Sequence, residues 1–203
     1  MKTLLIIDVQ NDFLEGGQLE VPRSNRIIPV INQIQESYDL IVATQDWHPE
    51  DHKSFASNHT GKKPFDKIML HGMPQTLWPD HCIQGSKGAA LHQGLNTGRI
   101  AAIFRKGMDP EVDSYSAFHD NNHQLATGLA GYLKEKGAVD IHFCGLAADI
   151  CVYYSILDSI LEGFTAFLVE DASSPLDNRH FDDVKCELVK LGVKIVTSSQ
   201  ITS

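Results

Sequence analysis

The feature that most constrains the fold of this chain is an alternation of short apolar runs with stretches of helical period. Six runs are rich in β-branched residues and bounded by Gly, Asp or polar residues, which is the signature of buried strands. These runs cover residues 3–7, 40–43, 101–104, 139–143, 166–169 and 193–196. Strands that alternate with helices are joined by crossover connections, so we predict an α/β fold with a mainly parallel sheet covered on both faces.

Four stretches place apolar residues at the 3.6-residue period of an amphipathic helix. The four stripes are Ile27, Ile28, Ile31 and Ile34; Leu125, Leu129, Tyr132 and Leu133; Tyr153, Ile156, Leu157 and Ile160; and Phe181, Val184, Leu188 and Leu191. Gly137 and Gly192 each follow lysines and are typical helix stops. Ligands of such folds sit at the carboxyl ends of the strands, so we expect a site in the segments that leave these ends, 8–17, 45–98 and 106–122.

Composition narrows the class of protein further. The chain has 203 residues, of which 42% are hydrophobic and 21% charged, and this balance is typical of a single globular domain. The net charge of −9 argues against nucleic acid as a partner, because phosphate binding needs clustered Lys and Arg. No apolar run approaches the ~18 residues of a membrane span, and Asp8 and Asp12 stand where a signal peptide would carry its cleavage site. We therefore expect a cytoplasmic protein with no membrane partner, and the sequence leaves a homo-oligomer open.

A first group of polar residues follows the second expected strand. Asp46 and His48 are two positions apart, so in extended chain they point to the same side. His52 follows after a turn, and His81 comes later in the same long loop, 45–98. Carboxylate and imidazole ligands together suit zinc, iron or manganese. With ten His in the chain, solvated loop histidines would give the same pattern, and spacing alone leaves both interpretations open.

A second group surrounds Cys151, where the fourth expected strand turns into a helix. A thiol in the first turn of a helix faces unpaired N–H groups and the positive end of the dipole, which favour the thiolate. Asp8 ends the first strand and Lys106 lies just past the third, so a carboxylate and an ammonium would flank this thiol. A buried, inert Cys151 and a plain salt bridge between Asp8 and Lys106 remain alternatives. The four Cys include no CxxC pair and do not suggest a disulfide framework.

Six motifs, taken in order, connect these groups. They are DVQNDF from Asp8, DWHP from Asp46, WPDHC from Trp78, FRKG from Phe104, DSYSAF from Asp113 and ADICV from Ala148. Over nearly its whole length the chain resembles the nicotinamidases (pyrazinamidases) of the isochorismatase-like cysteine hydrolase family. This resemblance implies a three-layer α/β/α fold with a six-stranded, mainly parallel sheet. It also implies one domain over residues 1–203, with a metal-binding loop region at about 45–98.

The resemblance further implies hydrolysis of nicotinamide to nicotinate and ammonia through a Cys thioester, in NAD salvage, with pyrazinamide as a second substrate. It implies a catalytic triad of Asp8, Lys106 and Cys151, with an oxyanion hole formed by the N–H groups of Ala147 and Cys151 and a cis peptide bond before Ala147. It implies that Phe13, Trp78 and Tyr115 form the walls of the ring pocket. It also implies that Asp46, His48 and His81 are metal ligands, and His52 aligns with a ligand that only part of the family uses. The cofactor is expected to be one divalent ion, zinc first, with iron and manganese as alternatives.

The chain departs from the family pattern at two positions beside the nucleophile. Ala148 stands where Thr is frequent, and Ile150 stands where an aromatic residue is common. These departures leave the triad untouched and concern the shape of the ring pocket.

Two rival functions remain. Another amidohydrolase of the same family, acting on a carbamoyl or ureido substrate, would share the triad but has no need of the metal-binding residues. A redox-sensing or metal-binding module would leave Asp8 and Lys106 without a role. An assay of ammonia release from nicotinamide, with and without chelator, separates these functions.

Overall fold

The computed structural model describes residues 1–202 and contains a six-stranded sheet in which all neighbouring strands are parallel. The strands are β1 (Lys2–Ile7), β2 (Leu40–Asp46), β5 (Ala102–Lys106), β6 (Asp140–Gly145), β7 (Thr165–Ser173) and β8 (Lys194–Val196). Their order across the sheet is β5-β2-β1-β6-β7-β8. All six predicted strands are confirmed, and several extend a few residues beyond the apolar runs.

The helices are α1 (Ile27–Ile34), α2 (Leu129–Glu135), α3 (Cys151–Leu161), α4 (Asn178–Lys190) and α5 (Ser198–Ile201), with 3₁₀ turns at Asn11–Phe13, Ser24–Arg26, Gln35–Ser37 and Ala56–Asn58. The four predicted helices are confirmed, and α5 was not predicted. The side chain of Asp177 caps α4 by accepting hydrogen bonds from the N–H groups of Arg179 and His180. Gly137 and Gly192 lie just beyond α2 and α4 with φ of 73° and 88°, as helix stops should.

The predicted start of the second helical stripe is wrong. Leu125 is 55% exposed and lies in the loop before α2. The Asp120 carboxylate accepts hydrogen bonds from the N–H groups of Gln124 and Leu125, and the backbone at Gly128 has φ of 89°. These turn interactions satisfy N–H groups that a helix would otherwise bond, so α2 begins only at Leu129.

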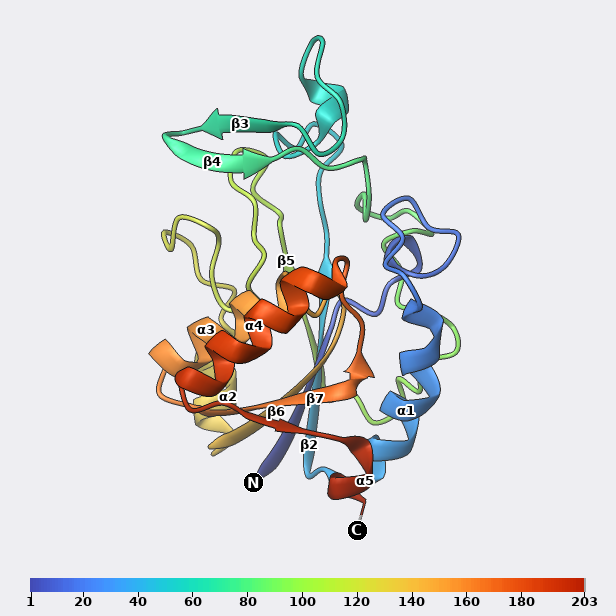
Figure 1. The fold of residues 1–203 in the computed structure, drawn as a ribbon, viewed down its shortest axis with the longest axis vertical. Coiled ribbons are helices and arrows are strands. Elements are labelled where there is room, and N and C mark those ends of the chain that lie inside the picture. Colours follow the sequence, from blue (N-terminus) through green and yellow to red (C-terminus); the bar gives the residue numbers. More distant parts are fainter. Residues whose placement is uncertain (203) are drawn as a thin grey trace.

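Two apolar layers cover the two faces of the sheet. Alternate residues of a strand point to opposite faces, so Leu4 and Ile6 of β1 pack in one layer and Leu5 and Ile7 in the other. The first layer contains the buried face of α1, and the second contains the buried residues of α2, α3 and α4. Figure 1 shows α1 on one side of the sheet and α2, α3 and α4 on the other. The three-layer α/β/α architecture is thereby confirmed.

The strands run toward the side of the sheet where the long loop 45–98 lies. This loop contains an antiparallel hairpin, β3 (Lys67–Leu70) and β4 (Met73–Thr76), which Figure 1 shows at the top of the molecule. The hairpin was not predicted, because its strands are only four residues long and mostly polar or exposed. It lies beyond the carboxyl ends of β1, β2 and β5, where a parallel α/β sheet binds its ligands.

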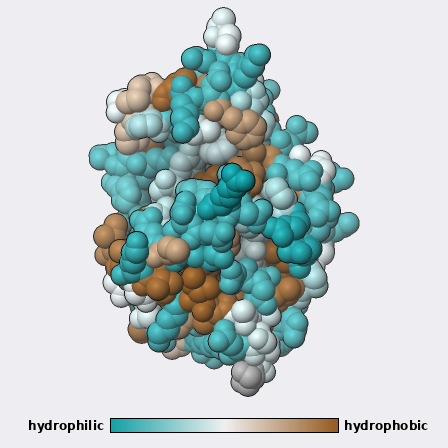
Figure 2. All heavy atoms as spheres, in the orientation of Figure 1, coloured by the Kyte–Doolittle hydropathy of each residue, from teal (hydrophilic) through white to brown (hydrophobic). Residues whose placement is uncertain are grey.

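Most of the face seen in Figure 2 is hydrophilic, and apolar side chains gather below α4, toward the outer strands of the sheet. Among residues 1–202, no helix has the length and hydropathy that a membrane crossing requires.

Candidate active site

Three ionisable side chains meet at the carboxyl ends of the strands. Asp8 follows β1, Lys106 ends β5, and Cys151 is the first residue of α3. Lys106 Nζ lies 2.9 Å from Asp8 Oδ2 and 3.6 Å from Cys151 Sγ. All three side chains are buried. Asp8 Oδ1 accepts a 2.6 Å hydrogen bond from the Thr44 hydroxyl, which fixes the carboxylate beside the ammonium.

Burial controls the ionisation of these groups. It raises the pKa of the Cys151 thiol well above its usual value, and the nearby Lys106 ammonium only partly opposes this effect. The sequence-based expectation of a thiolate rested only on the helix start and did not include the burial of this side chain, which favours the neutral thiol. Burial likewise raises the pKa of Asp8, against the opposing charge of Lys106. Cys151 therefore rests as a neutral thiol beside a carboxyl group of raised basicity.

The turn before α3 brings the backbone close to β1. A Cβ at Gly145 would lie 2.0 Å from the Ile7 carbonyl oxygen, and φ there is 118°, so only glycine fits. The next peptide bond, between Leu146 and Ala147, is cis, as the resemblance implied. Within residues 1–202, the N–H groups of Ala147 and Cys151 donate to no protein acceptor, and they are available to an anionic oxygen.

Asp46, His48 and His81 converge on one point. One ligand atom from each lies within 4.8 Å of the other two, and all three side chains are buried. Gln10 fixes the backbone of Asp46, because its amide donates a 2.8 Å hydrogen bond to the Asp46 carbonyl and accepts one of 2.8 Å from the Asp46 N–H. Asp46 Oδ1 also contacts Lys106 Nζ, so this carboxylate joins the trio to the Asp8–Lys106–Cys151 group.

The hydrogen bonds of the two imidazoles fit a metal ion. His81 Nδ1 lies 2.8 Å from the Pro79 carbonyl oxygen, so it carries the ring proton and leaves Nε2 as a ligand 3.7 Å from Asp46 Oδ2. His48 Nε2 lies 3.3 Å from Asp113 Oδ1, while the buried His48 Nδ1 has no hydrogen-bond partner among residues 1–202. A mixed carboxylate and imidazole set with an unpartnered ring nitrogen is suited to a divalent ion.

His52 lies beside the trio but groups with His48 and Asp113 instead. Its Nδ1 accepts hydrogen bonds from the Ser54 N–H at 3.1 Å and lies 2.8 Å from the Ser54 hydroxyl. Burial lowers the pKa of His52 to about 4, so the ring is neutral near pH 7. Since Nδ1 accepts, the ring proton sits on Nε2, and this argues against His52 as a ligand in the conformation described.

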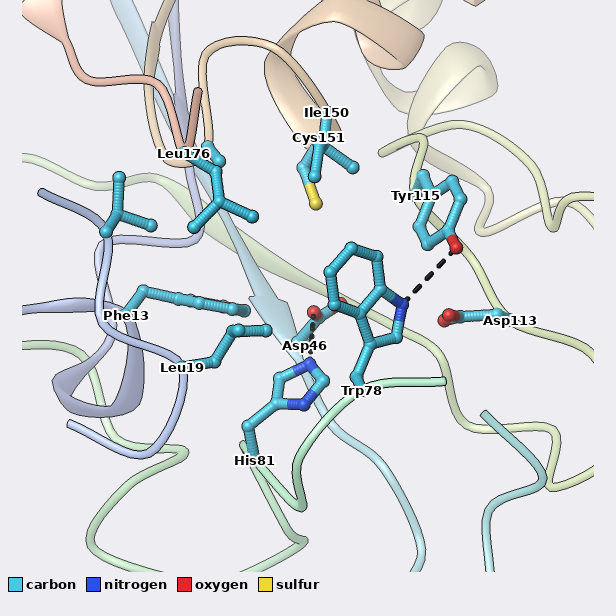
Figure 3. Close-up of a pocket in the computed structure, with 12 residues that line it drawn as sticks. Phe13, Leu19, Asp46, Trp78, His81, Asp113, Tyr115, Ile150, Cys151 and Leu176 are labelled. Atoms are coloured by element: carbon cyan, nitrogen blue, oxygen red, sulfur yellow. Dashed lines mark hydrogen bonds and ion pairs between the residues drawn. The ribbon is translucent and has the colours of Figure 1, made fainter. Parts of the chain in front are cut away.

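An apolar pocket lies between Cys151 and two residues of the trio, Asp46 and His81 (Figure 3). Its lining comes from six regions of the sequence and comprises Phe13, Leu19, Val21, Asp46, Trp78, His81, Asp113, Tyr115, Ala147, Ile150, Cys151 and Leu176. Figure 3 shows Cys151 and Ile150 at the top, Phe13 and Leu19 at the left, and Asp46 and His81 below. The three predicted wall residues, Phe13, Trp78 and Tyr115, all line this pocket.

Sequence reasoning missed several residues that shape the site. Asp113 belongs to a quoted motif but received no role, although it faces His48 and lines the pocket. Gln75 of β4 is buried and donates hydrogen bonds to Asp113 Oδ2 at 3.2 Å and to the Tyr115 hydroxyl at 3.1 Å. Gln10, a neutral side chain, carried no chemical signal of its own. Only the two-residue spacing of Gln10 from Asp8 could have pointed to it.

Comparison with known proteins identifies the class of protein to which this arrangement belongs. The family model of the isochorismatase domain matches residues 2–200, and the chain belongs to this family. Its relatives include a nicotinamidase of Acinetobacter baylyi, which is 44% identical over 199 residues that cover 98% of this chain and 93% of the relative.

Solved structures with the same fold include an Acinetobacter baumanii nicotinamidase pyrazinamidase, with a TM-score of 0.96, 42% identity and coverage of 98% of this chain and 97% of the other. An L. infantum protein in complex with nicotinate has a TM-score of 0.87 and 40% identity, and the match covers 98% of this chain and 93% of the other. A Pyrococcus horikoshii pyrazinamidase in complex with zinc has a TM-score of 0.79, 32% identity and coverage of 97% and 98%.

Proposed function

We propose that this protein is a nicotinamidase, which hydrolyses nicotinamide to nicotinate and ammonia, and that pyrazinamide is a second substrate. The observation that carries the proposal is the buried Asp8–Lys106–Cys151 group at the base of a pocket that also contains Asp46 and His81. The curated nicotinamidase relative and the nicotinate-bound neighbour support the choice of a pyridine carboxamide. Nicotinate is a precursor for NAD synthesis, so the activity would serve NAD salvage.

The first half of the reaction forms a bond between Cys151 and the substrate. Asp8 takes the thiol proton, and Cys151 Sγ attacks the amide carbonyl carbon while the ammonium of Lys106, 3.6 Å away, stabilises the charged sulfur. The carbonyl oxygen becomes an anion that accepts hydrogen bonds from the N–H groups of Ala147 and Cys151. The carbon–nitrogen bond then breaks, Asp8 returns its proton to the leaving nitrogen, and ammonia departs from a Cys151 thioester.

The second half releases the acid. Asp8 accepts a proton from water as the water oxygen attacks the thioester carbonyl, and the carbon–sulfur bond breaks. The proton returns to the Cys151 sulfur, because burial favours the neutral thiol over the thiolate. Asp8 thus moves protons in both halves of the cycle, and Lys106 holds its carboxylate in place at 2.9 Å.

We further propose that Asp46, His48 and His81 hold one divalent ion, zinc first and iron or manganese as alternatives. The zinc-bound pyrazinamidase neighbour supports the metal, and the unpartnered His48 Nδ1 supports the donor set. When bound, the ion supplies a Lewis-acid position at which the ring nitrogen of the substrate is anchored. Phe13, Trp78 and Tyr115 would enclose the ring, and Ile150 and Leu176 would border it with aliphatic surface.

An amidohydrolase for carbamoyl or ureido substrates is less well supported. Such an enzyme needs the Asp8–Lys106–Cys151 group, but it does not need three buried side chains arranged as metal ligands next to an apolar, aromatic-walled pocket. A redox or metal-binding module is also disfavoured, because Asp8 and Lys106 pair directly beside the thiol.

The proposed function is tested by ammonia release. The purified protein should release ammonia from nicotinamide and pyrazinamide, should lose this activity after chelation, and should regain it on addition of zinc, iron or manganese. His48→Ala should also lose activity, because it removes one donor of the trio. Benzamide has the same amide but no ring nitrogen, so it should be a poor substrate of the holoenzyme.

Two outcomes of this assay would contradict the proposal. Full activity of metal-free protein on nicotinamide would exclude a ring-anchoring ion, and equal rates on benzamide and nicotinamide would do the same. Release of ammonia from a ureido substrate but not from nicotinamide would instead favour the rival amidohydrolase.

Gly107→Ala should weaken metal binding although it replaces none of the proposed ligands. A Cβ at Gly107 would lie 2.7 Å from His48 Nε2, so the methyl group must displace a buried ring that faces Asp113. Because orientation of a ligating imidazole is worth ~10–100-fold in metal affinity, we expect a loss of this order in equilibrium dialysis against zinc.

The matched control for Gly107→Ala is Gly163→Ala. Both glycines have positive φ, 66° and 91°, so both substitutions strain the backbone by about 1 kcal/mol. In the described part of the chain, no heavy atom other than those of its sequence neighbours lies within 4 Å of a Cβ at Gly163, so this variant should lose stability but keep its metal affinity. Equal metal affinity in the two variants would refute a role of Gly107 in admitting the His48 ring.

We also propose that residues 1–203 act as a single domain, since two apolar layers pack on one sheet across residues 1–202. The four cysteines are free, and three of them are buried, which supports a reducing compartment such as the cytoplasm.

A further inference from the structure

We propose that His119, His123 and Asp158 form a second divalent-metal site, separate from the candidate active site. His119 and His123 lie in the loop between β5 and α2, and Asp158 lies on α3, two turns after Cys151. One ligand atom from each of the three residues lies within 4.8 Å of the other two. None of the three belongs to the group that the proposed function uses.

The spacing of the atoms fits a metal ion better than hydrogen bonds. His119 Nδ1 lies 3.5 Å from Asp158 Oδ2, and His123 Nε2 lies 3.5 Å from Asp158 Oδ1. Good hydrogen bonds between such atoms are about 2.7–3.2 Å long. Ligands of a tetrahedral zinc, each ~2.0–2.2 Å from the ion, are separated by about 3.4 Å.

Two polar atoms at this place are buried and lack a partner. Within residues 1–202, neither His119 Nδ1 nor Asp158 Oδ2 has a hydrogen-bond partner, and the two atoms face each other. The Asp158 side chain is only 7% exposed. A buried carboxylate oxygen without a hydrogen-bond partner is costly, and an ion between the two atoms would remove the cost.

The same pattern marks the proposed catalytic metal site. There, too, a buried imidazole nitrogen lacks a partner, at His48 Nδ1, and a carboxylate oxygen lies beyond hydrogen-bond distance from an imidazole, 3.7 Å between His81 and Asp46. An ordinary pair in this chain looks different. His71 and Glu111 lie 3.1 Å apart, and both side chains are about half exposed, at 49% and 51%.

The surroundings of the second site orient one ligand and admit the ion. Glu162 Oε1 lies 3.6 Å from His119 Nε2, so a carboxylate stands near the far side of this ring, although beyond hydrogen-bond distance, and Lys134 contacts Glu162 at 2.6 Å. The rings of His119 and His123 stack with an interplanar angle of 15°. A cavity of about 230 Å³, lined in part by His123 and Asp158, provides a path from solvent.

Two imidazoles and one carboxylate select borderline ions such as zinc, with a water molecule in the remaining position. An ion there would tie the loop to α3. The same loop supplies Ser114, whose carbonyl accepts a 2.9 Å hydrogen bond from Lys106 Nζ and whose hydroxyl donates one of 3.0 Å to the His119 carbonyl. The second site would therefore stabilise the segment that positions Lys106.

The test counts zinc ions bound to the folded protein. Metal-stripped protein is dialysed against low micromolar zinc, and bound metal is measured by mass spectrometry. We expect two equivalents for the wild type and for His71→Asn, one equivalent for Asp158→Asn and for His123→Asn, and one for His48→Ala. The double variant His48→Ala with His123→Asn should bind none. His123 is 54% exposed, so its replacement by Asn should leave the fold intact even where Asp158→Asn does not.

A thermal melt gives a second readout that needs no substrate. In the His48→Ala background, zinc at about a hundred times its dissociation constant should still raise Tm by roughly 5–10 °C, and added His123→Asn should abolish the rise. The proposal is overturned if His48→Ala binds no zinc, if a second equivalent persists in both Asp158→Asn and His123→Asn, or if the Tm rise survives in the double variant. Failure of the proposed function would appear instead as an absence of ammonia release, whatever the zinc count.

Discussion

Cys151→Ala is expected to abolish amide hydrolysis while the fold and the metal content stay intact. Cys151 Sγ lies 3.6 Å from Lys106 Nζ and lines the pocket, whereas the buried Cys82 does not line it, so Cys151 is the thiol placed to form the thioester. Loss of a nucleophile that acts with a base costs ~10⁴–10⁶-fold in kcat. The measurement is ammonia release, with the circular dichroism spectrum and zinc content of the variant as evidence of folding.

A covalent adduct provides a direct check on the same residue. When wild-type enzyme is quenched during turnover, mass spectrometry should detect a nicotinoyl group on the peptide that contains Cys151. Cys186→Ala is the matched control, because Cys186 is exposed on α4, far from the pocket lining, and its loss should leave both rate and adduct unchanged. Substantial turnover by Cys151→Ala would rule out the covalent mechanism.

Asp8→Asn is expected to reduce kcat by ~10²–10⁴-fold while KM changes little, because general acid–base transfer is lost and the ring is held elsewhere. The asparagine Oδ1 can still accept the hydrogen bond that Thr44 donates to Asp8 Oδ1 at 2.6 Å. Its amide group cannot accept the proton of the Cys151 thiol. Asp39→Asn, at an exposed carboxylate before β2, is the control and should behave as the wild type.

The pH profile distinguishes a base from a binding group. Burial raises the pKa of Asp8 above its ordinary value of 3.8, so kcat/KM of the wild type should fall as the pH drops through this raised pKa and protonates the carboxylate. Residual activity of Asp8→Asn should lack that acid limb. Near-normal kcat in Asp8→Asn with only a raised KM would make Asp8 a binding residue.

The alternation of apolar runs predicted the strands well because parallel strands are buried on both faces. Leu4, Leu5, Ile6 and Ile7 are all inaccessible to solvent, and such continuous burial leaves an unmistakable run in the sequence. The hairpin formed by β3 and β4 left no such run, since most of its residues are partly or fully exposed. The start of α2 was misplaced for a related reason, because side-chain hydrogen bonds to Asp120 override the apolar period at Leu125.

The candidate site was predictable where a reactive residue type stood at a strand end. Asp8, Asp46 and Lys106 could be placed this way, because the carboxyl ends of parallel strands meet at one edge of the sheet. Gln10, Gln75 and Asp113 could not, because their contribution is a hydrogen bond to a residue distant in the sequence, such as the bond between Gln75 and Asp113. The separation of His52 from the trio likewise depends on a local hydrogen bond to Ser54.

The sequence by itself determined the order of the strands and helices along the chain and the types of residue that stand at the strand ends. Both follow from local periodicity and from covalent position, which act over a few residues. The tertiary structure alone decided the burial of Cys151, which raises the pKa of its thiol and which the position at a helix start could not indicate. It alone also brought His119 and His123 to Asp158, because their approach depends on the packing of a loop against α3. Desolvation and contacts between distant segments are sums over the whole fold, and no short stretch of sequence contains them.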